Sequence, residues 1–194
     1  AAELDAKMNR PDSALQFLER YDPAREPLFK TRRLISANDL KKFDREQAER
    51  YVDEVLALEE KLRDTNDKIN KLDQEETLIK PWIGYATPLE MKGTHKTIIH
   101  EGVVPTTVDM TEIINEQEGI GGIVVKLINA DKDLNYVAFI CLRSKEEEIM
   151  SLLKQKGFSE VYFRHLKVTV SENVERIKKE KEELFAKVKD IEKE

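Results

Sequence analysis

The chain has 194 residues, of which 37% are charged and only 7% are aromatic, a balance that favours long solvated helices over one large globular core. The formal net charge is −6, and Lys and Arg are mixed with Asp and Glu along the same helices, so the sequence does not indicate a basic face for nucleic acid. The single cysteine excludes an intramolecular disulfide, and the sequence contains no run of about 18 apolar residues that would predict a membrane-spanning helix.

Residues 1–22 are predicted to form a helix, because their apolar residues recur at helical spacing. Pro11 marks a break or a first turn in this segment, since proline lacks the amide donor that a helix interior uses. Residues 22–38 contain two further prolines and lose the periodicity, which predicts a bend before the next helix.

The next helix is predicted to run from Ser36 to about Glu76. Ser36 and Asp39 match a capping box, in which a hydroxyl and a carboxylate satisfy amide groups at a helix start. From Tyr51 on, the apolar residues form one narrow seam at the heptad spacing of a coiled coil: Tyr51, Val55, Leu58, Leu62, Ile69 and Leu72. Because its other faces are charged or polar, this helix can bury only the seam, which predicts a partner helix.

The segment that follows has the composition of an α/β lobe. Pro81 ends the long helix, and β-branched runs then predict strands over 95–105, 121–131, 134–143 and 158–168. The third of these strands is apolar on both faces and is expected to lie inside the sheet. Two helices lie between the strands, over 106–119 and 144–157, and the order βαββαβ is the split-βαβ or ferredoxin-like pattern.

Both lobe helices show local signals. The first is expected to present Met110, Ile113 and Ile114 on one side. The second is expected to begin with a capping box formed by Ser144 and Glu147.

The last helix repeats the seam of the long helix. It is expected to begin with a capping box, Thr169 with Glu172, and its apolar residues have the same heptad spacing: Val170, Val174, Ile177, Leu184, Val188 and Ile191. The two seams are predicted to pair antiparallel with residue numbers that sum to about 246, which places Ile69 near Ile177 and Leu62 near Leu184. Because the long helix outlasts its visible partner, we expect the natural chain to continue beyond Glu194.

The predicted fold class is therefore α+β: a long antiparallel helical hairpin, or coiled coil, capped by a ferredoxin-like βαββαβ lobe. The predicted domains are a helical stalk over 1–76, the lobe over 77–168 and a returning coiled-coil helix over 169–194.

No constellation in the sequence indicates catalysis, a cofactor or a metal, and we expect none of these sites. His95 and His100 point to opposite faces of a strand and cannot converge on one ion. Cys141 could form a nucleophilic pair with His165, but its apolar strand favours a small buried hydrophobe. The glycines at 119–122 follow a helix and precede a strand, which is the reverse of a phosphate-binding loop.

Trp82 is the candidate for partner binding. It is the only tryptophan and lies where the long helix gives way to the lobe. One interpretation is a hinge residue packed against the lobe. The other is an anchor for a partner protein, because tryptophan is enriched at the centres of interfaces.

The order of elements and several short motifs resemble the soluble part of the large membrane-embedded stator subunit of V-type and archaeal-type rotary ATPases, called subunit I in prokaryotes and subunit a in eukaryotes. The resemblance covers the whole chain and includes the proline-rich hinge LIKPWIGYATPLEM. The residues Gly102, Val103, Val104 and Pro105 match the family's strand with G-V-P, and Gly157, Phe158 and Val161 match its G-F-x-x-V step.

This resemblance implies a non-catalytic stator arm on the cytoplasmic face of a membrane. Its implied partners are a helical heterodimer, the peripheral stalk, and other ATPase subunits, with membrane contact only through a C-terminal domain that lies outside this segment. The family's opening strand and helix and its ion-translocating residues are absent from the segment. Two other interpretations remain: a ligand-sensing module of the ACT type, which has the same βαββαβ order, and a generic coiled-coil tether.

Overall fold

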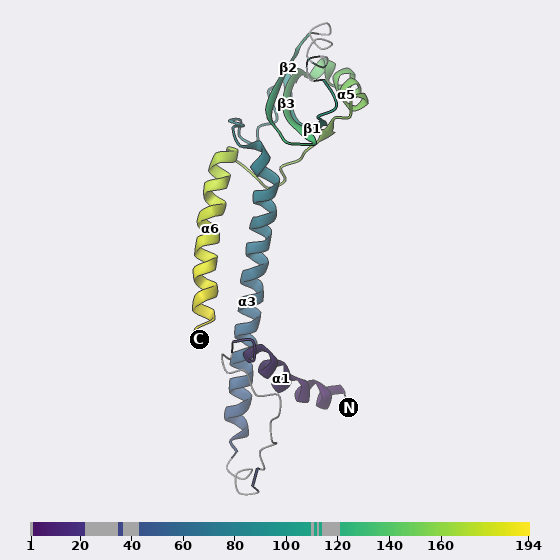
Figure 1. Cartoon of the computed structure of the whole chain (residues 1–194). Helices are drawn as coiled ribbons and strands as arrows, with labels where there is room; N and C mark the ends of the chain where they lie inside the picture. Colours follow the sequence, from purple (N-terminus) through teal and green to yellow (C-terminus); the bar gives the residue numbers. More distant parts are fainter. Residues whose placement is uncertain (1, 22–34, 37–42, 110, 112, 114–120) are drawn as a thin grey trace. The chain divides into compact units, whose positions relative to one another are not determined.

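A computed structural model of the chain describes residues 2–21, 35–36, 43–109, 111, 113 and 121–194 (Figure 1). The fold class is α+β, as predicted, with a helix of 35 residues and a four-stranded antiparallel sheet. The chain divides into two compact units, Ala1–Asn70 with Glu183–Glu194, and Lys71–Glu182. The predicted domain boundaries after residues 76 and 168 stay predictions. None of the described helices combines the length and apolar composition that a bilayer crossing requires.

The first unit contains helix α1 (Ala2–Leu18), most of α3 (Arg45–Ile79) and the end of α6 (Val170–Ile191). Pro11 lies inside α1 and does not end it, so the predicted break was wrong; a proline removes one helical hydrogen bond, and the flanking turns continue. The predicted start of the long helix at Ser36 was also wrong. Asp44 caps α3, since its Oδ1 accepts a hydrogen bond from the Gln47 amide at 3.0 Å. Asp39 and most of the bend predicted over 22–38 lie outside the described residues.

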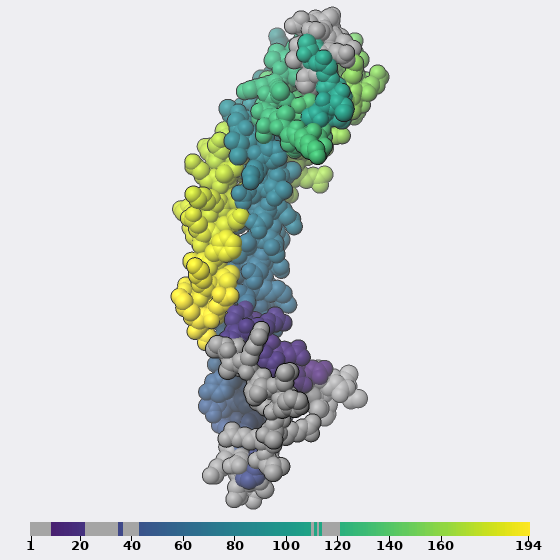
Figure 2. All heavy atoms as spheres, viewed as in Figure 1, coloured from purple at the N-terminus to yellow at the C-terminus, as the bar shows by residue number. Residues whose placement is uncertain are grey.

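Helices α3 and α6 pair with each other, as the two seams predicted, and their side chains lie directly against each other in Figure 2. In the first unit, Leu62 belongs to an apolar cluster with Phe17, Val188 and Ile191. The expected neighbour of Leu62 was Leu184, so the observed cluster lies one to two turns farther along α6.

Ion pairs across the same two helices occur in the second unit. Arg176 contacts Glu75 at 2.8 Å, and Lys181 contacts Asp73 at 2.5 Å and Glu76 at 2.8 Å. The predicted register placed Arg176 opposite position 70 of α3, whereas Arg176 contacts Glu75. The register therefore departs from the prediction in the same direction as it does at Leu62. A seam that repeats every seven residues fits several registers almost equally well, and charged residues beside the seam select one of them.

The sheet of the second unit has the predicted antiparallel arrangement. Its strands are β1 (Thr97–Pro105), β2 (Ile123–Ala130), β3 (Leu134–Leu142) and β4 (Ser159–Glu160), in the order β2-β3-β1-β4. Strand β3 lies between β2 and β1, which confirms the prediction of an inner strand. The fourth strand is much shorter than predicted and ends at Glu160. Later in the predicted range, His165 and Val168 have φ angles of 68° and 51°, which a strand does not contain.

One face of the sheet carries the core of the lobe. Helix α5 (Glu146–Gln155) packs on this face, visible in Figure 1. The shared cluster of buried residues comprises Val104, Ile113, Val137, Phe139, Cys141, Ile149, Leu153 and Phe158. Ile113 therefore faces the core as predicted, whereas Met110 and Ile114 lie outside the described residues.

The two remaining helix starts have different outcomes. The capping box before α6 is confirmed: the Thr169 amide donates to Glu172 Oε2 at 2.8 Å, and the Glu172 amide donates to Thr169 Oγ1 at 3.3 Å. The capping box of Ser144 with Glu147 was wrong. Residues Arg143–Lys145 form a 3₁₀ turn, η2, so Ser144 lies inside a tight turn and Lys145 occupies the position before α5.

Candidate functional site

The hinge, residues 80–92, connects α3 to the sheet and packs against the face opposite α5. It opens with a 3₁₀ turn, η1 (Lys80–Trp82), in which Pro81 needs no amide donor. Trp82 is 1% exposed and meets the rings of Tyr85, Tyr136 and Phe163 edge to face, with centroids 6.1, 5.7 and 5.2 Å away. Such aromatic pairs contribute about 0.5–1.5 kcal/mol each beyond their burial. This packing fits the interpretation of Trp82 as a hinge residue, and its role as a partner anchor stays a prediction.

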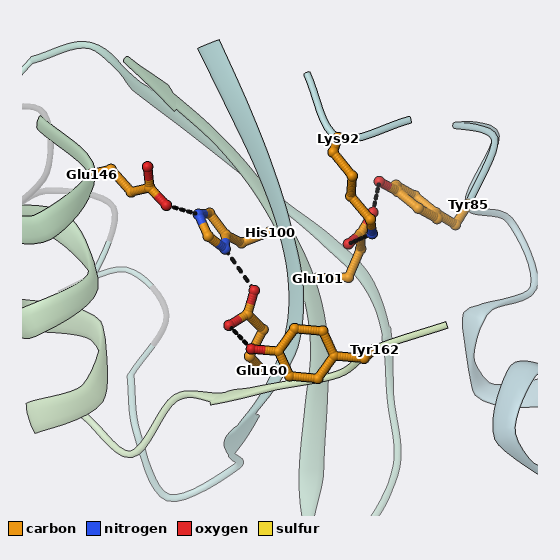
Figure 3. A network of polar contacts seen from close by, with 7 residues as sticks. All are labelled: Tyr85, Lys92, His100, Glu101, Glu146, Glu160 and Tyr162. Atoms are coloured by element: carbon orange, nitrogen blue, oxygen red, sulfur yellow. Dashed lines mark hydrogen bonds and ion pairs between the residues drawn. The ribbon is translucent and has the colours of Figure 1, made fainter. Parts of the chain in front are cut away.

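Glu101 of β1 ties the hinge to the sheet. Its side chain is 2% exposed, and both carboxylate oxygens have partners: the Tyr85 hydroxyl donates to Oε1 at 3.1 Å, and Lys92 Nζ contacts Oε2 at 3.0 Å (Figure 3). Burial, and next the charge of Glu101, raise the pKa of Tyr85 well above its ordinary value, so this hydroxyl stays a donor. A buried carboxylate that is fully paired serves to fix structure, because removal of either partner leaves an uncompensated charge.

His100, the residue before Glu101, projects from the other face of β1. Its Nδ1 lies 2.7 Å from Glu160 Oε1 and its Nε2 lies 3.1 Å from Glu146 Oε1, so one ring connects β1 with β4 and with the start of α5 (Figure 3). The ring also stacks on Phe139 at 5.0 Å. The tautomer of the ring decides which nitrogen donates and which accepts.

Glu160, one of the two acidic residues that contact His100, is stabilised in its ionised form. Burial alone raises the pKa of Glu160, but hydrogen bonds from Tyr162 and His100, with the charges of His100 and Lys154, together hold it below its usual range. The Tyr162 hydroxyl donates to Glu160 Oε2 at 2.5 Å. His100 and its two acidic partners, Glu146 and Glu160, therefore hold β1, the start of α5 and β4 together. We call these three residues the acid clamp.

The residues considered for metal and thiol chemistry are not brought together. His95 is exposed and precedes β1, while His100 is buried among carboxylates that bind opposite nitrogens of its ring. Within the described part of the chain, no three His, Cys, Asp or Glu side chains are arranged to hold a metal ion. Cys141 is buried in the core cluster, and burial, followed by the charge of Glu146, raises its pKa, which disfavours the reactive thiolate.

The two short motifs of the sequence resemblance pack against each other. A Cβ atom at Gly102 would lie 2.3 Å from the ring of Phe158 and 2.5 Å from the Ser159 carbonyl oxygen. Gly157, with a φ of 85°, lies beside Pro105, whose Cδ would be 3.2 Å from an added Cβ. Gly102 therefore leaves room for Phe158 and Ser159, and Gly157 leaves room for Pro105. This close packing explains why both motifs contain glycine.

Part of the sheet face beside the hinge is open, and sequence reasoning did not identify it. Ile123 and Val125 pack on the core cluster, so Val124 between them points to the opposite face, where it is 67% exposed. Its cross-strand partner Ile140 is 42% exposed, and Leu142, two residues along the same strand, is 37% exposed. We call Val124, Ile140 and Leu142 the open sheet patch. The apolar pattern of β3 predicts an inner strand, and it does not tell which stretch of that strand the hinge leaves open.

No protein-family model and no curated protein sequence matches the chain. Among solved structures, the chain is similar to the crystal structure of the cytoplasmic N-terminal domain of subunit I, homolog of subunit a, of V-ATPase. The TM-score is 0.49 and the sequence identity is 11%, and the similarity covers 100% of this chain and 64% of that one. The chain thus spans less than two thirds of the length of that structure.

Proposed function

We propose that this chain is the stator arm of a V-type or archaeal-type rotary ATPase. It is the soluble, non-catalytic part of the ion-translocating subunit, and its lobe docks a peripheral stalk made of paired helices. The observation that carries the proposal is the pairing of the two helices that lead into and out of the lobe. A single helix bends under load, whereas two helices joined along a seam resist bending and twisting.

Several contacts of moderate strength hold this pair together. Arg176 bonds both Glu75 of α3 and Glu180 of its own helix, and Lys181 contacts two carboxylates of α3. The hydrogen bond from Lys181 to Asp73, and next the one to Glu76, raise the pKa of Lys181 above its ordinary value. Partly exposed ion pairs contribute roughly 0.2–1 kcal/mol each, so the buried seam supplies most of the stability and the ion pairs fix the register.

The lobe is built to carry a load from this helix pair. Trp82 and Glu101 hold the hinge on the sheet, and His100 holds α5 and β4 on the same strand. A partner that docks on the lobe therefore contacts a preorganised surface, and force on that surface passes into α3 through packed side chains. The motif residues at 102–105 and 157–161, which support the resemblance to the stator subunit, lie in this part of the lobe.

The remaining parts of the proposal follow from the same family. The arm lies on the cytoplasmic face, joins other ATPase subunits and reaches the membrane through a domain outside this segment. Ion translocation would belong to that domain. The ligand-sensing and tether interpretations predict other outcomes in the test below.

The test is isothermal titration calorimetry of the chain, residues 1–194, against the peripheral-stalk heterodimer of the same organism. We expect saturable 1:1 binding of modest affinity, because a lobe of this size offers an interface at the low end of the usual range. An unrelated heterodimeric coiled coil of similar length and charge is the control. Absence of binding to the stalk refutes the proposal, and thermal stabilisation of the chain by free amino acids would favour the sensor instead.

A further inference from the structure

We propose that the open sheet patch is the docking surface for an acidic amphipathic helix of the partner. The inference rests on the proposed function, which supplies a helical partner, and it adds the place and the chemistry of docking. The patch consists of Val124, Ile140 and Leu142 on β2 and β3, with the cations Lys96, Lys126 and Arg143 around it.

The three apolar residues are neighbours on one face. Val124 pairs with Ile140 in the β2–β3 register, and Leu142 follows two positions along β3 and pairs with Thr97 of β1. A solvated face of an antiparallel sheet normally carries polar residues at these alternating positions. Adjacent apolar side chains that are each more than a third exposed mark a surface that another element covers.

Among the described residues of the three strands and their flanks, the exposed charges beside the patch are positive. Strands β2 and β3 contain no Asp or Glu, and the only carboxylate of β1, Glu101, is buried and bound by Lys92. Lys126 lies two residues beyond Val124 on the same strand, and Arg143 directly follows Leu142. Within the described ranges, no ion pair joins Lys96, Lys126 or Arg143 to a carboxylate.

The position of these cations is defined by backbone contacts. The Arg143 amide donates to the Lys96 carbonyl at 3.0 Å, so both residues lie at the same end of the sheet as Leu142. Arg143 Nε also donates to the Thr94 carbonyl at 3.0 Å. In a chain with a net charge of −6, this local excess of positive charge selects a partner segment that carries carboxylates beside its apolar residues.

The shape of the site favours a helix over a strand. In the described part of the lobe, the α-helix α5 packs on one face of the sheet, and a helix on the second face completes a three-layer arrangement. A strand would instead add to the free edge of β2, but the register of β2 shifts between Leu127 and Asn129, and such a bulge interrupts an edge. An amphipathic helix presents anchors at i, i+3 and i+4, which match a small apolar surface with a charged rim.

The experiment compares variants of the whole chain in binding to the stalk heterodimer by calorimetry at two salt concentrations. We expect Val124→Asp to weaken binding at least tenfold, and Lys126→Glu to weaken it at least threefold and to reduce its salt dependence. Leu127→Asp is the matched control, because Leu127 is on the same strand and is 51% exposed. Leu127 pairs with Val137 of the core cluster and therefore lies on the opposite face from the patch. Its replacement should change binding less than twofold. Circular dichroism melts check that each variant folds, and Lys126→Glu tests the idea if Val124→Asp does not fold.

A second probe separates this inference from the proposed function. A synthetic Leu/Glu amphipathic peptide should bind the chain, and its Leu/Lys counterpart should not. If the stalk binds and both Val124→Asp and Lys126→Glu keep wild-type affinity, docking occurs elsewhere and only the inference is overturned. If the stalk does not bind but the acidic peptide does, and Val124→Asp abolishes that binding, the stator proposal fails and the helix-docking surface stands. Binding of phosphatidylglycerol vesicles that Lys126→Glu abolishes, with helix binding unaffected, would assign the patch to a membrane and overturn the inference.

Discussion

Replacement of Trp82 by alanine should open the lobe, because this one side chain joins the hinge to the sheet and to the segment after β4. Its ring is 1% exposed and contacts three aromatic rings. Truncation of a buried tryptophan to alanine costs about 3–5 kcal/mol through lost burial and the cavity that remains. Domains of this kind have a free energy of unfolding of about 5–15 kcal/mol, so the loss is a large fraction of the total.

The assay can be confined to the lobe, because Cys141 is the only cysteine and lies in the lobe core. A bulky thiol reagent reaches it only when the lobe opens, and the labelling rate then reports the free energy of opening. A loss of about 3 kcal/mol corresponds to a labelling rate roughly 100-fold faster. Trp82→Phe keeps an aromatic ring and should accelerate labelling much less.

The surface control is Phe185→Ala on α6, since Phe185 is 48% exposed and such substitutions usually change stability by less than about 0.5 kcal/mol. Urea denaturation followed by circular dichroism gives an independent value for each variant. If Trp82→Ala changes the labelling rate less than about fivefold, the ring does not hold the hinge and the interpretation is wrong.

Three further predictions concern the seam, the motif contact and the acid clamp. Leu62→Cys with Ile191→Cys should form a disulfide efficiently and Leu62→Cys with Leu184→Cys poorly, as judged by non-reducing electrophoresis; the reverse result would restore the register expected from the sequence. Gly102→Ala should destabilise the lobe by about 1–3 kcal/mol in urea denaturation, because its Cβ has no room, and an unchanged midpoint would show that the ring beside it moves away at little cost. The pKa of Glu160 is lowered in the folded state, so its contribution to stability is present above its ordinary value near 4.5 and is lost as the pH falls below it. Glu160→Gln should therefore flatten the decline of melting temperature between about pH 5 and pH 3, and an unaltered decline would exclude this carboxylate as its source.

The sequence identified the elements that depend on local pattern. The helices, the inner strand β3 and the capping box at Thr169 all follow from spacing and from residues within one turn of each other. Capping sequences also occur where no helix starts in the expected way. Ser144 lies in a 3₁₀ turn, and Asp44, which was not considered, caps the long helix. A local signal shows that a helix can start at a residue, and the surrounding structure decides whether it does.

The features that the sequence did not predict depend on contacts between distant residues or on backbone angles. The contacts of His100 with Glu146 and Glu160 span 46 and 60 positions, and no spacing rule connects residues so far apart. Val168, within the range predicted as the fourth strand, has a φ of 51°, although a β-branched residue favours extended backbone. The open sheet patch is similar, because its exposure depends on where the hinge ends.

Strand β1 links these features, since two successive residues on it hold opposite faces of the lobe. His100 fixes the helix layer and Glu101 fixes the hinge. Removing a partner from a buried carboxylate such as Glu101 costs about 3–5 kcal/mol. Both groups are already paired in the chain by itself. Docking on the open sheet patch would leave both networks intact and would cover apolar side chains that now face solvent. A partner helix could therefore bind without reorganising the lobe, and its binding energy would be available to resist displacement under load.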